Sequence, residues 1–409
     1  MDTSPTTPAV GRRRLLAAGG ALALGGALAG AAAGTAARGD ARGDARPQPP
    51  AFGRQTVAFH GPHQAGIETP AQAHAAFLGL DLHDGTDRAA LGRMMRLLTD
   101  DAVRLTRGEP ALADTEAELA ALPARLTVTF GFGPGLFRAA GLDDRRPASL
   151  EPLPPFAIDR LQDRWCGGDL LIQICADDPL TVAHAQRMLI KDARSFARLR
   201  WAQRGFRNGR GMQGDATTQR NLMGQVDGTV NPPPDSEVFA RAVWTDAGPE
   251  WLRGGTTLVL RRIRMELETW DLADTRAKEF SVGRTLGTGA PLTGTAEHDE
   301  PDFDAQDALG LPVIPEFAHI RRARVADPAQ RIFRRPYNYD DAPAADGTPD
   351  TGLLFASFQR DIAEQFLPVQ RALAAADQLN QWTTPIGSAV FAVPPGCAPG
   401  GWIGERLLG

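Results

Sequence analysis

Short apolar runs alternate with amphipathic stretches through the first half of the chain. Three runs of mostly apolar residues predict buried strands, and apolar positions that recur at helical spacing predict two helices between and after them. The predicted strands span residues 75–82, 125–132 and 169–176, and the predicted helices span 87–105 and 179–196. Strands and helices intermixed in this way indicate an α+β fold.

The second half of the chain repeats the same kinds of element. Residues 255–267 and 353–359 predict strands, residues 363–379 predict a helix, and residues 388–393 predict a closing strand. No sequence identity between the two halves is visible, so the pattern alone leaves the number of domains open.

Two long intervals interrupt these elements, at residues 205–234 and 283–327, and both are rich in glycine, proline and charge. Loops of that length within a compact domain are usually either functional or disordered. We favour a functional role, because the intervals contain Asp227 and His319.

The N-terminus predicts an export signal of the twin-arginine kind. Arg12, Arg13 and Arg14 precede a run without charge, residues 15–37, that consists mostly of alanine and glycine. A membrane anchor is the alternative, since about 20 apolar residues can span a bilayer. A run so poor in large apolar side chains inserts weakly, so we expect residues 1–37 to be cleaved and the mature protein to have no stable membrane insertion.

A charged, glycine-rich repeat follows this signal and leads into a proline-rich stretch. We interpret residues 38–54 as a flexible leader, because nothing in this composition can form a packed core. The leader contains two Arg-Gly-Asp triplets. They are consistent with cell adhesion, but the repeat composition alone explains them.

Charge and cysteine content exclude two classes of function. The net charge of −5 provides no basic face for nucleic acid. The three cysteines, Cys166, Cys175 and Cys397, are an odd number without metal-type spacing. A disulfide framework and thiol-based redox chemistry are therefore not expected.

Three types of functional side chain stand out in the second half. Asp227 lies between Gly224 and Gly228 in an otherwise apolar segment, where the alternative interpretation is an ordinary Asp-Gly turn. His319 and the arginine pair at 334–335 follow later in the chain. A carboxylate, an imidazole and a guanidinium together are the equipment of a haem peroxidase.

The chain resembles the dye-decolourising (DyP-type) peroxidases along nearly all of its predicted mature length. The matching motifs, in the order of that family, are residues 59–67, Gly224-x-x-Asp227-Gly228, residues 318–321, residues 334–335, and the segment 353–361. This resemblance implies two ferredoxin-like α+β halves, residues 55–220 and 221–409. Their antiparallel sheets would face each other in a dimeric α+β barrel-like core, with the haem in the second half.

The resemblance implies that one haem b per chain is held by His319 as the axial ligand of the iron. Of the seven histidines, His298 lies in an acidic loop, and His74 and His184 lie in helical surroundings. His60 and His63 belong to the first matching motif, where a structural role is expected.

An axial imidazole usually needs an acceptor for its second nitrogen, and Asp361 is the candidate for that role. Asp361 also precedes the predicted helix 363–379, so a helix N-cap is an equally good interpretation of this aspartate.

The resemblance assigns peroxide activation to Asp227, which transfers a proton, and to Arg334, which stabilises the developing negative charge. An aspartate with an ordinary pKa of roughly 4 acts as a base in acid, so a low pH optimum is predicted. Arg335 competes for the role of Arg334. Gly228, Thr229 and Val230 match a segment that touches haem in the family, and contacts from residues 324–326 are a further possibility.

Bulky substrates cannot reach a buried haem edge, so their electrons would travel through an aromatic side chain. Five candidates for this role are Tyr337, Tyr339, Trp251, Trp270 and Trp382. Core packing is the more common role of such residues.

The function predicted first is an exported haem peroxidase that reduces hydrogen peroxide through an oxyferryl intermediate and oxidises dyes, phenols or similar small reductants. The alternative is a haem-handling protein that releases iron from haem or delivers haem, as a deferrochelatase does. The twin-arginine machinery is the expected export partner, with a secreted or cell-envelope location, and an oligomer is compatible with the sequence.

Overall fold

The computed structural model describes residues 52–214, 217–343 and 346–409. The predicted signal, residues 1–37, lies outside the described residues. Of the predicted leader only residues 52–54 are described, and they form a short 3-10 helix, Phe52–Arg54. Within the described ranges no helix is long and apolar enough to cross a membrane.

The strands form one antiparallel sheet of nine strands that closes on itself. Their bounds are β1 (His74–Leu82), β2 (Thr127–Phe132), β3 (Leu170–Ala176), β4 (Ala197–Phe206), β5 (Thr256–Met265), β6 (Phe333–Arg334), β7 (Tyr337–Asp341), β8 (Asp350–Gln359) and β9 (Thr383–Val393). The order is β5-β9-β2-β3-β1-β4-β7-β8-β6, and β5 also pairs with β8, which completes the ring. A ring leaves few strand edges exposed.

Both halves of the ring have the strand order of a ferredoxin-like unit. In the first half, β4, β1, β3 and β2 lie side by side, and in the second half β9, β5, β8 and β7 do. Single residue pairs join the two halves, Phe132 with Ala392 on one side and Phe206 with Asn338 on the other. The predicted α+β fold with two ferredoxin-like halves in a barrel-like core is confirmed.

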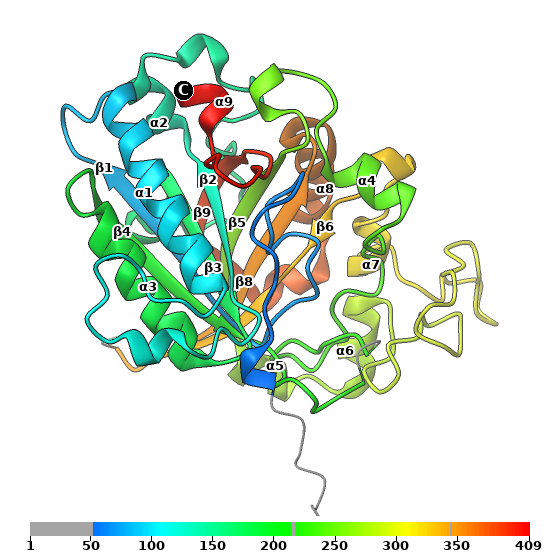
Figure 1. Cartoon of the computed structure of the whole chain (residues 1–409). Coiled ribbons are helices and arrows are strands. Elements are labelled where there is room, and N and C mark those ends of the chain that lie inside the picture. Colours follow the sequence, from blue (N-terminus) through cyan, green and yellow to red (C-terminus); the bar gives the residue numbers. More distant parts are fainter. Residues whose placement is uncertain (1–51, 215–216, 344–345) are drawn as a thin grey trace, which may run out of the picture. The chain divides into compact units, whose positions relative to one another are not determined.

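Helices cover the outside of the strands. Their bounds are α1 (Arg88–Thr106), α2 (Pro134–Ala140), α3 (Pro179–Ala193), α4 (Glu237–Val243), α5 (Leu267–Leu272), α6 (Thr275–Val282), α7 (His319–Arg322), α8 (Leu367–Ala376) and α9 (Glu405–Leu408). Helices α1 and α3 pack against each other beside the strands of the first half (Figure 1). Asp87 and Asp178 cap them by accepting hydrogen bonds from Ala90 N and Thr181 N.

The sequence predicted most of these elements but not all. The sequence does not predict β4, because a buried Gln203 and an exposed Leu199 break its alternation, or β7, because Pro336 separates it from β6. The predicted helix 363–379 is divided: it begins as a π-helix at Ile362–Phe366, continues as α8, and ends before Asp377.

The motif at residues 59–67 has the structural role expected of it. The Gln64 side chain donates to the backbone oxygens of Phe130 and Pro394 at 3.0 and 2.9 Å and accepts from Phe130 N at 2.8 Å. His63 stacks on Trp244 with ring centroids 3.7 Å apart. These contacts tie the start of the described chain to strands of both halves.

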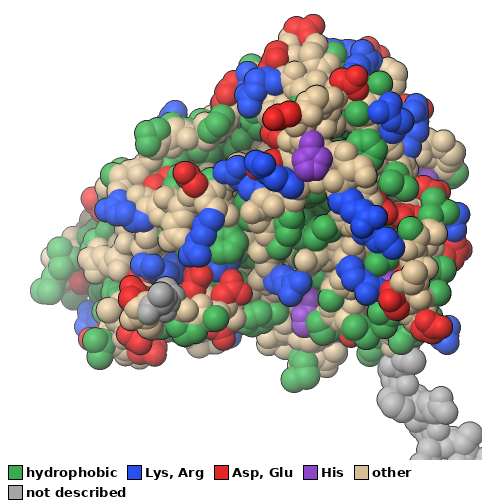
Figure 2. Space-filling model, turned by 90° about the vertical axis from the view of Figure 1, so that its left-hand side faces the viewer, with side chains coloured by type: hydrophobic (Ala, Val, Ile, Leu, Met, Phe, Trp, Pro, Cys, Tyr) green, Lys and Arg blue, Asp and Glu red, His purple; other side chains and the backbone are tan. Residues whose placement is uncertain are grey.

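The surface has no dominant charge on the face that Figure 2 presents. Lysine and arginine side chains are interspersed there with aspartate and glutamate, and hydrophobic groups lie between them.

Candidate functional site

The aspartate of the glycine-flanked segment sits at the end of a tight loop. An isolated bridge pairs Arg220 with Val226, and Asn221 closes the loop by accepting from the backbone N–H groups of Met223 and Gln225. Gly224 has a φ of +78°, a conformation that favours glycine. The loop therefore presents Asp227 from a backbone with little freedom.

Asp227 pairs with Arg334, 107 residues further along the chain. Arg334 Nη1 lies 2.7 Å from Asp227 Oδ1, and the two side chains are 19% and 10% exposed. The second carboxylate oxygen is freer, since its contact is Asn221 Nδ2 at 3.5 Å. The structure thus brings together the two predicted catalytic residues, as a largely buried ion pair with one oxygen available.

Arg334 and Arg335 point in opposite directions, as successive residues of an extended chain do. Arg335 is 2% exposed and donates to Thr69 O and to the Gln72 side chain in the first half of the chain. Arg335 is therefore a structural arginine, and Arg334 is the one beside Asp227.

His319 opens the short helix α7, and its Nδ1 lies 2.7 Å from Asp377 Oδ2. The Asp377 side chain is 4% exposed, and its other oxygen accepts from Leu379 N. Burial alone would lower the pKa of the His319 imidazole, but the Asp377 carboxylate outweighs burial and the net direction is upward. The structure thus supplies the second-nitrogen acceptor that an axial histidine needs.

The prediction that Asp361 holds the imidazole is wrong. Its side chain accepts from the backbone N–H groups of Ala363 and Glu364, so it caps the π-helix. The N-cap interpretation is confirmed instead. The sequence contained no signal for Asp377, because its proximity to His319 depends on how α7 packs against α8.

The residues present fit a haem. With Nδ1 bound to Asp377, the remaining ring nitrogen, Nε2, is the one able to ligate iron, and the side chain is 34% exposed. Arg334 lowers and Asp227 raises the pKa of this imidazole, each less than Asp377 does. Among the described residues, no cluster of three or more His, Cys, Asp or Glu could hold a bare metal ion. One imidazole in the same half of the chain as an Asp–Arg pair suits iron carried by a porphyrin.

The predicted haem-contact segment follows Asp227 directly. Gly228 has a φ of +141°, and the Thr229 hydroxyl donates to Glu297 Oε1 at 2.9 Å. The Val230 side chain is 63% exposed. Thr229 therefore tethers the interval after residue 283 to the Asp227 loop, while contacts of these three residues with haem stay predictions.

All five aromatic candidates for electron transfer are buried. Both tyrosines are inaccessible, and Trp251, Trp270 and Trp382 are exposed by 2%, 3% and 9%. Burial raises the pKa of both Tyr337 and Tyr339 above the ordinary tyrosine value. A surface aromatic for bulky reductants is therefore not among these five residues.

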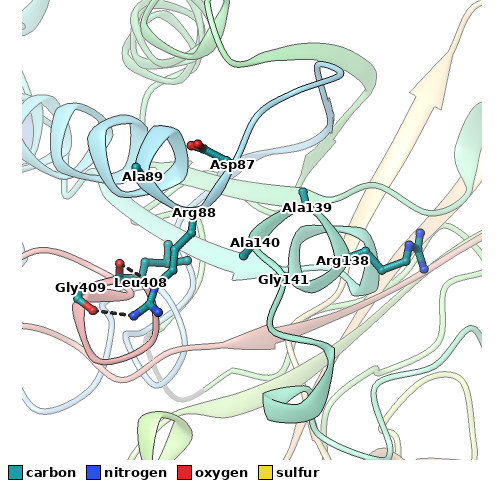
Figure 3. Close-up of a pocket in the computed structure, with 9 residues that line it drawn as sticks. All are labelled: Asp87, Arg88, Ala89, Arg138, Ala139, Ala140, Gly141, Leu408 and Gly409. Atoms are coloured by element: carbon teal, nitrogen blue, oxygen red, sulfur yellow. Dashed lines mark hydrogen bonds between the residues drawn. The ribbon is translucent and has the colours of Figure 1, made fainter.

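A shallow pocket lies away from these residues, between the start of α1, the end of α2 and the C-terminal helix (Figure 3). There Arg88 donates to the backbone oxygens of Leu408 and Gly409, at 3.3 and 2.6 Å. These hydrogen bonds of Arg88 anchor the end of the chain. The residues that line the pocket include none of the predicted functional residues.

Comparison with known proteins identifies the family of the chain. Residues 64–207 match the model for the Dyp-type peroxidase N-terminal part, and residues 218–398 match the model for the C-terminal part. A dye-decolorizing peroxidase of Thermobifida fusca is 41% identical over 84% of this chain and 83% of its own length. A deferrochelatase of Yersinia pestis bv. Antiqua is 36% identical over 87% of this chain and 85% of its own.

A solved structure gives the same answer. The crystal structure of a DyP-type peroxidase from Cellulomonas bogoriensis is 55% identical, with a TM-score of 0.85, and the match covers 88% of this chain and 99% of that one. The chain belongs to the Dyp-type peroxidase family, and it is a haem-dependent peroxidase of the dye-decolourising type.

Proposed function

We propose that the protein binds one haem b per chain through His319 and uses Asp227 and Arg334 to activate hydrogen peroxide. The observation that carries this proposal is the 2.7 Å contact between Asp227 and Arg334, in the same half of the chain as the imidazole held by Asp377. The electron donors would be dyes, phenols or similar small aromatic reductants.

The contacts of each side chain indicate its role in the proposed reaction. When bound, haem would supply the iron and its redox chemistry. Asp377, 2.7 Å from His319 Nδ1, would accept a hydrogen bond from that nitrogen and leave Nε2 to hold the metal. Asp227 Oδ2, the oxygen not bound by Arg334, would take a proton from peroxide and return it to the departing oxygen. Arg334 provides a fixed positive charge where negative charge develops.

Spectra of variants test this assignment. Purified protein loaded with haem should show a Soret band that changes rapidly with one equivalent of hydrogen peroxide. Asp227→Asn and Arg334→Leu should keep the band but react about 100-fold more slowly or worse, and His319→Ala should bind haem weakly. The exposed neighbour Arg331 gives a matched control, Arg331→Leu. Full peroxide reactivity in Arg334→Leu would overturn the assignment.

Haem handling is the second candidate, because the Yersinia relative is named a deferrochelatase. Iron release would need the pocket but not the Asp227–Arg334 pair, so the presence of that pair favours the peroxidase. Incubation with haem under reducing conditions distinguishes the two: appearance of iron-free porphyrin fluorescence, undiminished in Arg334→Leu, would favour haem handling.

Export through the twin-arginine machinery is part of the same proposal. It is supported by Arg12, Arg13 and Arg14 before the uncharged run at residues 15–37. Such a route carries folded proteins, which suits a protein that acquires its cofactor before export. We expect a secreted or cell-envelope location, a leader at residues 38–54, and halves divided near residue 220. N-terminal sequencing of the exported protein, with Arg12 and Arg13 replaced by lysine as the control, tests cleavage and route together.

A further inference from the structure

One edge of strand β6 is not paired with another strand of the described chain. Strands β6 and β7 run along the same edge of β8, with Arg334 opposite Ser357 and Tyr337 opposite Leu354. On their other side β4 pairs with β7 at Asn338 and ends at Phe206. The edge of β6 that faces away from β8 is therefore not covered by β4.

The backbone of Arg334 faces this uncovered edge. Arg335 N donates to Ala356 O on β8 at 2.8 Å. Backbone groups of successive strand residues point to alternate sides, so the N–H and C=O of Arg334 point away from β8. Left unpaired in a partly buried position, these two groups would destabilise the strand.

Asn231 takes the place of the missing strand. Its Nδ2 donates to Arg334 O at 2.7 Å, and its Oδ1 accepts from Arg334 N at 3.0 Å. One side-chain amide thus pairs with both backbone groups of the residue that carries the guanidinium.

The same asparagine is tied to Asp227. Its own backbone N–H donates to Gly228 O at 2.9 Å, closing a turn that begins next to Asp227. Pro232 follows and restricts Asn231 to an extended backbone. The contacts form a ring: Asp227 to the Arg334 side chain, the Arg334 backbone to Asn231, and Asn231 through the turn back to Asp227.

We propose that Asn231 is a positioning residue for peroxide activation, which fixes the distance between Asp227 and Arg334 by holding the Arg334 backbone. This proposal rests on the proposed function of that pair. Few side chains could substitute, because the position needs a donor and an acceptor at one length. Aspartate keeps the acceptor but sets a carboxylate against the Arg334 carbonyl, and alanine removes both bonds.

Hydrogen exchange at the Arg334 amide tests the bond itself, in haem-free and haem-loaded protein. Asn231→Ala should accelerate this exchange about tenfold, the effect of losing one hydrogen bond, while Asn231→Asp should retain more protection. Ser236→Ala is the matched control, because it removes the cap of α4 from the same segment without touching Arg334. Unchanged exchange in Asn231→Ala would overturn the proposal.

Stopped-flow reaction with hydrogen peroxide tests the positioning role. Asn231→Ala should lower the second-order rate constant about 10- to 100-fold, as a displacement of about 1 Å at a catalytic pair does, and Ser236→Ala should not. In an Arg334→Leu background, Asn231→Ala should add less than about twofold, because its effect passes through Arg334. An equal loss in both backgrounds would show a merely structural role. If Asn231→Ala fails to fold, Asn231→Asp carries the same comparison.

The exchange and stopped-flow measurements distinguish a failure of this proposal from a failure of the proposed function. A wild-type protein that binds haem but ignores peroxide would refute the peroxidase assignment, and the exchange measurement would still report whether Asn231 holds Arg334.

Discussion

Replacing Asp377 by asparagine is the sharpest perturbation of the haem ligand that the structure offers. Asparagine has almost the same shape and can still accept from Leu379 N, but it removes the negative charge 2.7 Å from His319 Nδ1. The variant therefore changes the electrostatics of the ligand with little change in packing.

The size of the effect follows from the contact. A hydrogen bond to a charged group contributes about 1.5–3 kcal/mol, and this carboxylate is 4% exposed, so solvent screens it little. Residues that orient a metal-binding histidine typically contribute 10- to 100-fold in affinity. We expect haem loss from Asp377→Asn to be faster by about that factor, and the reduction potential of the iron to rise.

Transfer of haem to excess apomyoglobin, followed in the Soret region, measures this rate. Asp361→Asn is the matched control, because asparagine caps a helix about as well as aspartate and Asp361 makes its side-chain contacts to the π-helix. Faster haem loss from Asp361→Asn than from Asp377→Asn, or a wild-type rate in Asp377→Asn, would contradict this role of Asp377.

Other measurements probe the fold and its pH dependence. Burial and the neighbouring Asp101 raise the pKa of Asp192 to about 7. The folded protein thus holds a proton that the unfolded chain releases, and stability should fall as pH rises from about 4 to 7. Asp192→Asn should therefore raise the calorimetric Tm more at pH 8 than at pH 5, and an equal rise at both would contradict this. Gln64→Ala should lower stability by about 3 kcal/mol or more in urea unfolding, because three buried backbone groups lose partners, while the rate with peroxide stays unchanged. Turnover measured against pH should peak in acid if Asp227 acts as the base, and a peak above neutrality would contradict that role.

Sequence patterns predicted elements whose signal is local. Strand β3 is buried along its whole length, and α1 has an aspartate cap before an apolar stripe, so both could be located without tertiary information. Strand β4 places arginines at exposed positions, but the polar Gln203 is buried and the apolar Leu199 is exposed, so the alternation of residue types is broken. The missed strand is also the one whose end leaves the edge of β6 uncovered.

The residues of the candidate site also divide into those with a local sequence signal and those without one. Asp227, His319 and Arg334 were found because they belong to motifs with recognisable neighbours. Asp377 was not, since it lies 58 residues from His319 and its role arises only where α7 meets α8. Asp361 is a candidate partner of His319 because it lies in a matching motif. Membership of a motif does not tell which way its side chain faces.

The duplicated topology explains why the second half carries this site. In the first half the connection from β1 to β2 contains α1, a helix of 19 residues with a buried face against the sheet. The corresponding connection from β5 to the strand β6–β7 is divided among α5, α6 and α7, of 6, 8 and 4 residues. Such short helices cover less of a sheet, and the His319 side chain on α7 remains 34% exposed. The imidazole, the carboxylates and the guanidinium of the candidate site therefore all come from the half whose connection lacks a long helix.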